Sequence, residues 1–142
     1  TSTTRDKWAG QYWCTYIVVD SYTLAGFEGM TVGTLGGVES MRKFFASTPG
    51  YNYVDYAKSD HKIAIQSIGP GYAIFMQKVY QQQSDQNHVG IIEKVNVDEN
   101  GNGTIETIES NASKIRKSYQ VAGWEIIPIS YPITGFGGHT AI

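Results

Sequence analysis

The first third of the chain carries apolar residues at the spacing of helices. Segment 13–25 is largely apolar and is followed by Gly26, a residue type common directly after a helix, so a helix is predicted there. Its Ile17-Val18-Val19 run taken alone favours a strand, because β-branched side chains fit strands well. A second helix is predicted where apolar residues recur three or four positions apart before a Pro-Gly pair, at Val38, Met41, Phe44 and Phe45 before Pro49-Gly50.

After about residue 60 the pattern changes to short runs of β-prone residues separated by turn residues. The predicted strands are 63–65, 72–76, 89–97, 104–110, 118–122 and 124–130. Helices followed by an antiparallel sheet predict an α+β fold, with N-terminal helices packed on a C-terminal antiparallel β-sheet in a single domain over residues 1–133. The segment 134–142 contains three glycines, and we expect it to be a flexible tail.

Composition and charge narrow the class of protein. The 142 residues, 41% hydrophobic and 17% charged, suit one compact domain with its own core. A net charge of -2 argues against nucleic acid as a partner, which would need a basic face. The longest apolar run ends at Asp20 and is too short to span a membrane. One cysteine allows no internal disulfide. We therefore expect a monomer that does not bind nucleic acid and has no membrane span.

Cys14 is the first candidate for chemistry. It lies at the predicted start of the first helix, where the helix dipole and the N–H groups of the first turn favour a thiolate. A lone cysteine is also often a small buried apolar residue, and nucleophilic chemistry needs a base beside the thiol.

The three histidines differ in what they offer as that base. His61 follows a polar turn and His139 lies in the glycine-rich tail, so both are interpreted as solvated surface residues. His88 begins the strand-like segment 88–92. A histidine at the start of a strand can be held rigidly while one ring nitrogen stays available, so His88 is the candidate base.

A predicted hairpin brings polar groups to His88. The turn 98–103 separates two strand-like runs. If the turn is centred, Asn111 lies opposite Gly90 and two positions from His88, about 7 Å, whereas Glu109 lies four positions away, about 13 Å. A bulge could shift this register by a residue or two, so either side chain could orient His88.

Five short motifs follow one another along the chain: a Trp-Cys opening at 13–26, a Gly-Pro-Gly strand entry at 69–75, a His-led strand at 88–93, a Glu-x-Asn ending at 108–111 and a Trp-led strand at 124–128. Each motif is short, and their order carries the resemblance. This ordered set resembles the CHAP family, papain-like and NlpC-related cysteine amidases and peptidases that act on bacterial peptidoglycan.

The resemblance implies a papain-like fold and a set of catalytic roles. Cys14 would be the nucleophile, and His88 the general base that later protonates the leaving amine. Glu109 would orient His88, and Asn111 would assist. The spacing in the hairpin favours Asn111 as the nearer group, so the division between Glu109 and Asn111 stays open.

The same resemblance implies an oxyanion site formed by the Cys14 backbone N–H and a nearby side chain, with Gln11, Tyr12 and Trp13 as the oxyanion or substrate-binding candidates. Many relatives carry Gln directly before the cysteine, where this chain has Trp13. That departure leaves the identity of the oxyanion partner open.

The implied function is a cysteine-dependent hydrolase of amide bonds in peptidoglycan, acting as an N-acetylmuramoyl-L-alanine amidase or as a peptide endopeptidase. Such an enzyme needs no cofactor or metal and would be secreted or held in the cell envelope. The alternative is a non-catalytic module on the same fold that binds the cell wall or a protein. Hydrolysis of a different amide by the same residues is a further alternative.

One motif favours a competing interpretation. Asp98-x-Asn100-x-Asn102-Gly103 followed by Glu109 matches the calcium loop of an EF-hand. An EF-hand needs a helix on each side, and the flanking segments here are strand-like. A plain hairpin turn is therefore the preferred interpretation, with weak calcium binding by the loop left open.

A small basic cluster, Lys114, Arg116 and Lys117, follows Glu109 in the chain. We interpret it as a solvated strand edge, which discourages aggregation. Attraction of an anionic wall polymer is the alternative.

Overall fold

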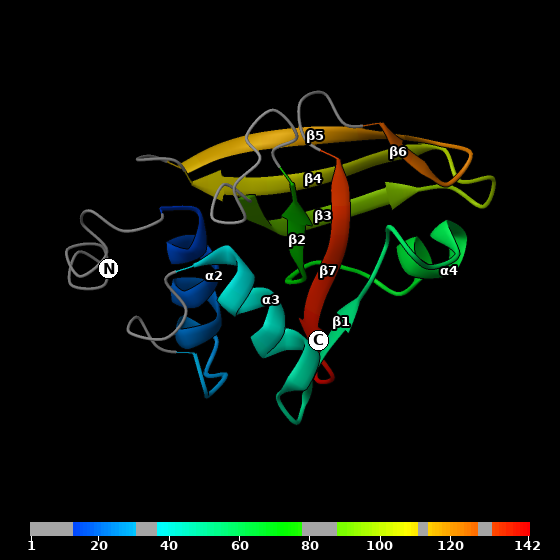
Figure 1. Ribbon diagram of the computed structural model, residues 1–142. Coiled ribbons are helices and arrows are strands. Elements are labelled where there is room, and N and C mark those ends of the chain that lie inside the picture. Colours follow the sequence, from blue (N-terminus) through cyan, green and yellow to red (C-terminus); the bar gives the residue numbers. More distant parts are fainter. Residues whose placement is uncertain (1–12, 31–36, 78–87, 111–113, 128–131) are drawn as a thin grey trace.

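The computed structural model of the chain describes residues 13–30, 37–77, 88–110, 114–127 and 132–142 (Figure 1). The described helices are α2 (Trp13–Leu24), α3 (Val38–Ser47) and α4 (His61–Gln66). The described strands are β1 (Tyr51–Val54), β2 (Ala73–Met76), β3 (His88–Val97), β4 (Gly103–Ser110), β5 (Lys114–Ala122), β6 (Glu125–Ile127) and β7 (Ile133–His139). These strands form one antiparallel sheet in the order β1-β7-β2-β3-β4-β5-β6.

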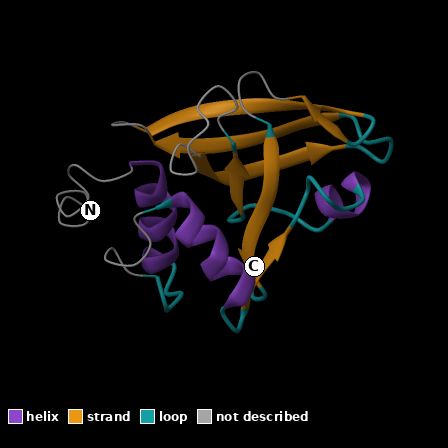
Figure 2. Cartoon of the chain, viewed as in Figure 1, coloured by secondary structure: helices purple, strands orange, loops and turns teal. Residues whose placement is uncertain are grey.

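The sheet curls into a half-barrel. In Figure 1 strands β3 to β6 run across the top of the molecule, while β2, β7 and β1 descend from them at a steep angle. Figure 2 shows that strands make up more of the described chain than helices do. The three described helices are short, and none of them is long and apolar enough to cross a bilayer.

The expected fold class, a papain-like α+β arrangement of N-terminal helices packed on a C-terminal sheet, is wrong. The curled seven-stranded sheet dominates the described chain and takes strands from both halves of the sequence. Strand β1 comes from the N-terminal half and forms one edge of the sheet, paired with β7. A division of the chain into helices first and strands later therefore does not describe it.

The glycine-rich segment 134–142, expected to be a flexible tail, supplies most of β7. This strand is paired with β1 on one side and with β2 on the other. Its glycines make room for aromatic rings, because a Cβ at Gly137 would lie 2.4 Å from Phe45 and one at Gly138 would lie 2.4 Å from Tyr72. The lack of a side chain at these glycines therefore allows aromatic rings to pack directly on β7. That residues 1–133 form one catalytic domain stays a prediction.

Residues 63–65, predicted as a strand, lie in helix α4. The side chain of Asp60 accepts a hydrogen bond from the Ile63 backbone N–H, so it caps the helix. Ala64 and Ile65 turn inward, whereas Ile63 is exposed. The β-prone residues Ile63 and Ile65 favour a strand when taken alone, and the cap at Asp60 is the signal that distinguishes the two structures.

The two predicted N-terminal helices are confirmed. Helix α2 ends at a Schellman motif, in which the N–H groups of Phe27 and Gly26 donate to the carbonyls of Tyr22 and Thr23. Gly26 has a φ of 87°, the left-handed conformation that favours glycine. The rings of Tyr22 and Phe27 pack at 5.5 Å between centroids, which completes the motif and fixes the direction in which the chain leaves α2.

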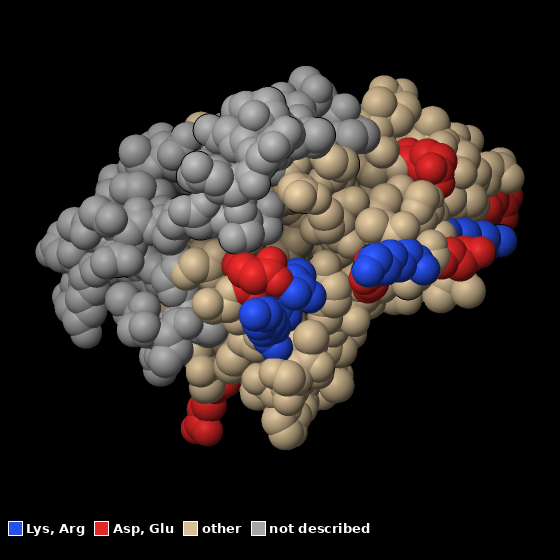
Figure 3. All heavy atoms as spheres, in the orientation of Figure 1, with Lys and Arg blue, Asp and Glu red and all other residues tan. Residues whose placement is uncertain are grey.

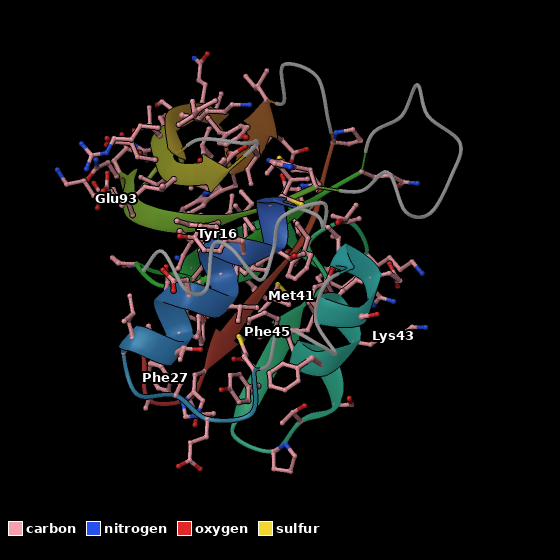
Figure 4. All side chains as sticks on the ribbon, turned by 90° about the vertical axis from the view of Figure 1, so that its left-hand side faces the viewer. Tyr16, Phe27, Met41, Lys43, Phe45 and Glu93 are labelled. Atoms are coloured by element: carbon pink, nitrogen blue, oxygen red, sulfur yellow. The ribbon has the colours of Figure 1, made fainter. Side chains whose placement is uncertain are left out.

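The sheet buries a core on each face. One core joins α2 and α3 to Ala73, Phe75 and Val89 of the sheet. Figure 4 shows Met41 and Phe45 of α3 between that helix and α2. The other core lines the inner face of the curl and includes side chains from six of the strands, among them Met76, Tyr119 and Phe136. Because side chains alternate along a strand, neighbouring residues of β2 and β3 serve opposite cores.

Candidate active site

Cys14 is the second residue of α2, and its side chain is 8% exposed. Helix α2 packs against β3 and β4, so it brings its first turn close to the sheet. In the first turn of any helix the backbone N–H groups have no acceptor within the helix itself. The thiol therefore lies at the positive end of a helix, at its contact with the sheet.

His88 is the first residue of β3, and it interacts with groups on two different elements. Its Nε2 lies 2.8 Å from Oε1 of Glu109 in β4. The thiol of Cys14 in α2 lies near enough to be among the groups that raise the pKa of the imidazole. Cys14, His88 and Glu109 thus form one interacting series from helix to sheet.

Glu109 ends this series as a buried carboxylate that is 2% exposed. Its Oε2 accepts hydrogen bonds from Thr107 Oγ1 at 2.7 Å and from the Tyr119 hydroxyl at 2.5 Å. Lys117 Nζ lies 3.6 Å from Oε1. Burial alone would raise the pKa of Glu109, but the hydrogen bonds from His88, Tyr119 and Thr107 outweigh it and lower the pKa to about 2. Glu109 is therefore ionised at neutral pH.

The register of the hairpin explains why Glu109 reaches His88. Gly103 pairs with Val97, so the turn holds five residues where six were expected. A bulge between Ile92 and Lys94 shifts the pairing by one residue more. Ile91 consequently pairs with Ile108, which places the next residue, Gly90, opposite Glu109.

The expected register, which put Asn111 opposite Gly90, is therefore wrong by two residues. The turn is one residue shorter than expected and the bulge adds one more. As a result Glu109 is the group that contacts His88. Asn111 lies outside the described residues, so its predicted role is not addressed.

Gly90 leaves space for the carboxylate to cross to His88. A Cβ at this position would lie 2.6 Å from Cγ of Glu109 and 3.3 Å from the Ile108 carbonyl oxygen. The 2.6 Å contact is closer than two carbon atoms tolerate, so a side chain at residue 90 would force Glu109 to shift. The glycine is part of the site although it carries no functional group.

The surroundings of His88 keep its imidazole protonated. Burial lowers its pKa, but hydrogen bonds to Cys14 and Glu109 and the negative charges of both partners outweigh burial and raise the pKa to about 9. His88 therefore carries a positive charge at neutral pH.

These two pKa changes predict how stability depends on pH. Glu109 stabilises the fold fully above its ordinary pKa of 4.5, and this contribution is lost as the pH falls towards 2. His88 contributes fully below its ordinary pKa of 6.5, and this contribution is lost as the pH rises through 9. We expect the free energy of unfolding to be greatest between pH 4.5 and pH 6.5. It is expected to fall by about 3 kcal/mol as the pH is lowered to 2 or raised above 9.

Urea unfolding at about pH 3, about pH 5.5 and about pH 9.5 measures this dependence. Glu109→Gln is expected to remove most of the loss of stability at acid pH. The control is Glu106→Gln, since Glu106 lies on the same strand as Glu109 but makes an exposed hydrogen bond with Asn96, and it is expected to leave that loss in place. Equal acid-side losses in the wild type and in Glu109→Gln would contradict the prediction.

The other predicted oxyanion or substrate-binding residues fall outside what the structure describes. Gln11 and Tyr12 precede the described residues. Trp13 begins α2, but its side chain is not described. The assignment of the oxyanion partner stays a prediction.

The two remaining histidines are held by contacts, which the sequence did not indicate. His61 Nδ1 bonds to Glu125, and its ring stacks on Tyr56 with centroids 4.0 Å apart. His139 lies in β7, where its ring packs against Phe27 and Tyr51. Both histidines are partly exposed, so the interpretation as surface residues agrees with their positions, although each also packs against aromatic rings.

Thr107 and Tyr119 are site residues that sequence reasoning missed. Thr107 lies two residues before Glu109 on β4, so both side chains share one face of the sheet. Alternation along β4 could have indicated Thr107. Tyr119 comes from β5, and only the pairing of β4 with β5 brings it near.

The calcium-loop motif forms a plain hairpin turn, as preferred. Asp98 Oδ1 accepts hydrogen bonds from the backbone N–H groups of Asn100 and Asn102, each at 2.9 Å. Both flanks are strands, β3 and β4, and Glu109 is committed to His88. Among the described residues no group of three or more His, Cys, Asp or Glu side chains is placed to hold a metal ion.

Charged side chains near β5 are interspersed with charges of opposite sign. Arg116 NH2 lies 3.2 Å from Oε2 of Glu93, and Lys117 lies beside Glu109. Figure 3 shows the same mixing on the face it draws, where described Lys and Arg lie beside Asp and Glu. The interpretation of 114–117 as a solvated strand edge stays a prediction, as does attraction of an anionic polymer.

No family model, curated protein or solved structure matches the chain. The resemblance to the CHAP family rests on the ordered motifs alone, and what it implies for function stays a prediction. The geometry of Cys14, His88 and Glu109 stands independently of that resemblance.

Proposed function

We propose that this protein is a cysteine-dependent hydrolase of amide bonds. The observation that carries the proposal is the hydrogen bond by which the buried Glu109 carboxylate holds His88, whose imidazole is also influenced by the Cys14 thiol. A nucleophile, a base in contact with it and a third group that orients the base are the arrangement that nucleophilic catalysis requires.

The proposed chemistry uses Cys14 and His88 in two successive stages. The Cys14 thiolate attacks the amide carbon, and the tetrahedral oxyanion is stabilised by N–H groups at the start of α2, including that of Cys14. The C–N bond then breaks as protonated His88 gives its proton to the leaving amine, which yields a thioester. Neutral His88 next takes a proton from water, the hydroxide attacks the thioester, and the acid product leaves as the thiolate is restored beside protonated His88.

The substrate we propose is bacterial peptidoglycan, and this part rests on the order of the five motifs. Either the bond between N-acetylmuramic acid and L-alanine or a bond within the peptides would suit the same catalytic residues. A substrate of this kind requires a protein that is secreted or held in the cell envelope.

Digestion of purified peptidoglycan by the wild type and by Cys14→Ala, followed by mass spectrometry, tests the proposal. Soluble fragments are expected from the wild type alone, because alanine offers no nucleophile. A new amino group on alanine at the muramic acid junction would identify an amidase, and one within a peptide would identify an endopeptidase.

Two other outcomes contradict the proposed activity. Binding of both proteins to the wall without release of fragments would favour the non-catalytic binding module. Absence of both release and binding, across several wall chemotypes, would mean that the substrate is not peptidoglycan, and short peptide amides would then test the hydrolase chemistry alone.

A further inference from the structure

Tyr119 reaches the candidate site from an unexpected distance along the sheet. It pairs with Ile105, whereas Glu109 lies four residues further along β4, about 13 Å away in an extended strand. Only a long side chain lying along the face of the sheet spans that distance. The hydroxyl of Tyr119 nevertheless lies 2.5 Å from Oε2 of Glu109.

The same hydroxyl lies where three strands converge. It is 3.3 Å from the sulfur of Met76 in β2, although β3 and β4 separate β2 from β5 in the sheet. Met76 in turn pairs with His88. Three strand spacings of a flat sheet would hold β2 and β5 about 14 Å apart, so the curl of the sheet is what allows this contact. The Tyr119 hydroxyl is thus held between Met76 and Glu109 within the inner core.

The two oxygens of the Glu109 carboxylate have different hydrogen-bond partners. Oε1 bonds to His88, and Oε2 accepts from the hydroxyls of Tyr119 and Thr107. Two donors on one oxygen fix the rotation of the carboxylate, and the other oxygen is then aimed at the imidazole. An ionised carboxylate is a far stronger acceptor than a thioether, so the hydroxyl proton of Tyr119 goes to Glu109 and Met76 supplies packing.

We propose that Tyr119 is a positioning residue of the hydrolase, which acts on His88 through Glu109 by donating the hydrogen bond that holds the carboxylate ionised and correctly rotated. Thr107 is the second donor to the same oxygen. This inference rests on the proposed function for its catalytic consequence, and on the geometry of the buried carboxylate for the rest.

Removal of the Tyr119 hydroxyl leaves Oε2 with one donor in a buried place. The pKa of Glu109 then rises from about 2 towards its ordinary value of 4.5, since one of the bonds that lower it is lost. The carboxylate also gains freedom to rotate away from His88. Both effects weaken the group that orients the imidazole.

The test compares Tyr119→Phe with Tyr56→Phe. Tyr56 belongs to the same inner core, and its hydroxyl accepts a hydrogen bond from the Ile126 backbone N–H. This control therefore removes a tyrosine hydroxyl from the same core that makes no hydrogen bond to Glu109. Carbon NMR titration of the Glu109 carboxyl and the acid limb of the profile of kcat against pH are measured for each variant. Thr107→Ser, which keeps a hydroxyl, and Thr107→Val, which removes it, form a second matched pair.

For Tyr119→Phe we expect an upward move of the Glu109 pKa and of the acid limb, with kcat about tenfold to a hundredfold lower and KM little changed, as fits loss of one hydrogen bond to a buried charge. Tyr56→Phe is expected to resemble the wild type and Thr107→Val to resemble Tyr119→Phe, whereas Thr107→Ser, which keeps a hydroxyl, is expected to raise the Glu109 pKa less than Thr107→Val does.

An unchanged Glu109 titration in Tyr119→Phe would overturn the inference, even if activity fell, because a purely structural role would explain that fall. The titration needs no substrate. A wild type without hydrolytic activity would therefore overturn the proposed function and the catalytic role, while an upward move of the Glu109 pKa would still support Tyr119 as the residue that holds the carboxylate.

Discussion

Replacing His88 with alanine is expected to slow amide hydrolysis about a thousandfold. The imidazole supplies the positive charge beside the Cys14 thiol and the proton that the leaving amine takes, and alanine supplies neither. Proton transfer by a positioned side chain contributes about a hundredfold to ten-thousandfold to a rate, so its loss is a large effect. Steady-state kcat/KM for the release of soluble fragments from peptidoglycan measures this loss of rate.

The same variant tests the thiol directly, without any substrate. At neutral pH the reaction of Cys14 with iodoacetamide is expected to be much slower in His88→Ala than in the wild type, because the base beside the thiol is gone. His61→Ala is the matched control, since His61 pairs with a different carboxylate, that of Glu125. Equally slow labelling of all three proteins would refute an activated thiol and favour the non-catalytic module.

Replacing Gly90 with alanine is the second large effect, although only a methyl group is added. That methyl carbon would lie 2.6 Å from Cγ of Glu109, so the carboxylate must move away from His88. We expect kcat/KM to fall about a hundredfold and stability to fall by about 1 to 3 kcal/mol, the cost typical of overpacking a core. The pKa of His88 is expected to drop from about 9, because its bond to Glu109 is among the causes that raise it.

Proton NMR titration of His88 and urea unfolding measure these changes. Gly69→Ala is the matched control, because a Cβ at Gly69 meets no atom within 4 Å. A Gly90→Ala protein with the His88 pKa of the wild type would show that Glu109 is not held in place by the space at residue 90.

The sequence allowed the three residues of the candidate series to be chosen, but not their spacing. Cys14 could be chosen from its place at a helix start, and His88 from its place at a strand start. The choice between Glu109 and Asn111 depended on register, and register depends on turn length and bulges. Here the turn is one residue short of the expected length, and a bulge near Lys94 adds a further residue. Local pattern does not report either change.

The fold was less accessible to sequence reasoning than the site. The amphipathic pattern of α3 and the Gly26 stop of α2 predicted both helices correctly. Strand β7 was missed because glycine has little preference for strands, and its stability there comes from rings of Phe45 and Tyr72 supplied by other elements. Tyr119 was missed for a similar reason, since its hydrogen-bond partner Glu109 lies on another strand, four residues beyond Ile105, with which Tyr119 pairs.

The curl of the sheet bears on the proposed catalysis as well as on packing. The Tyr119 hydroxyl meets both Glu109 and Met76 only while β2 and β5 lean towards one another across the strands between them. A modest flattening of the sheet would separate these groups without breaking a single backbone pair between neighbouring strands. Curvature is therefore a degree of freedom to which the orientation of His88 is coupled, and a ligand or partner that changed it would alter the proposed hydrolase activity from a distance.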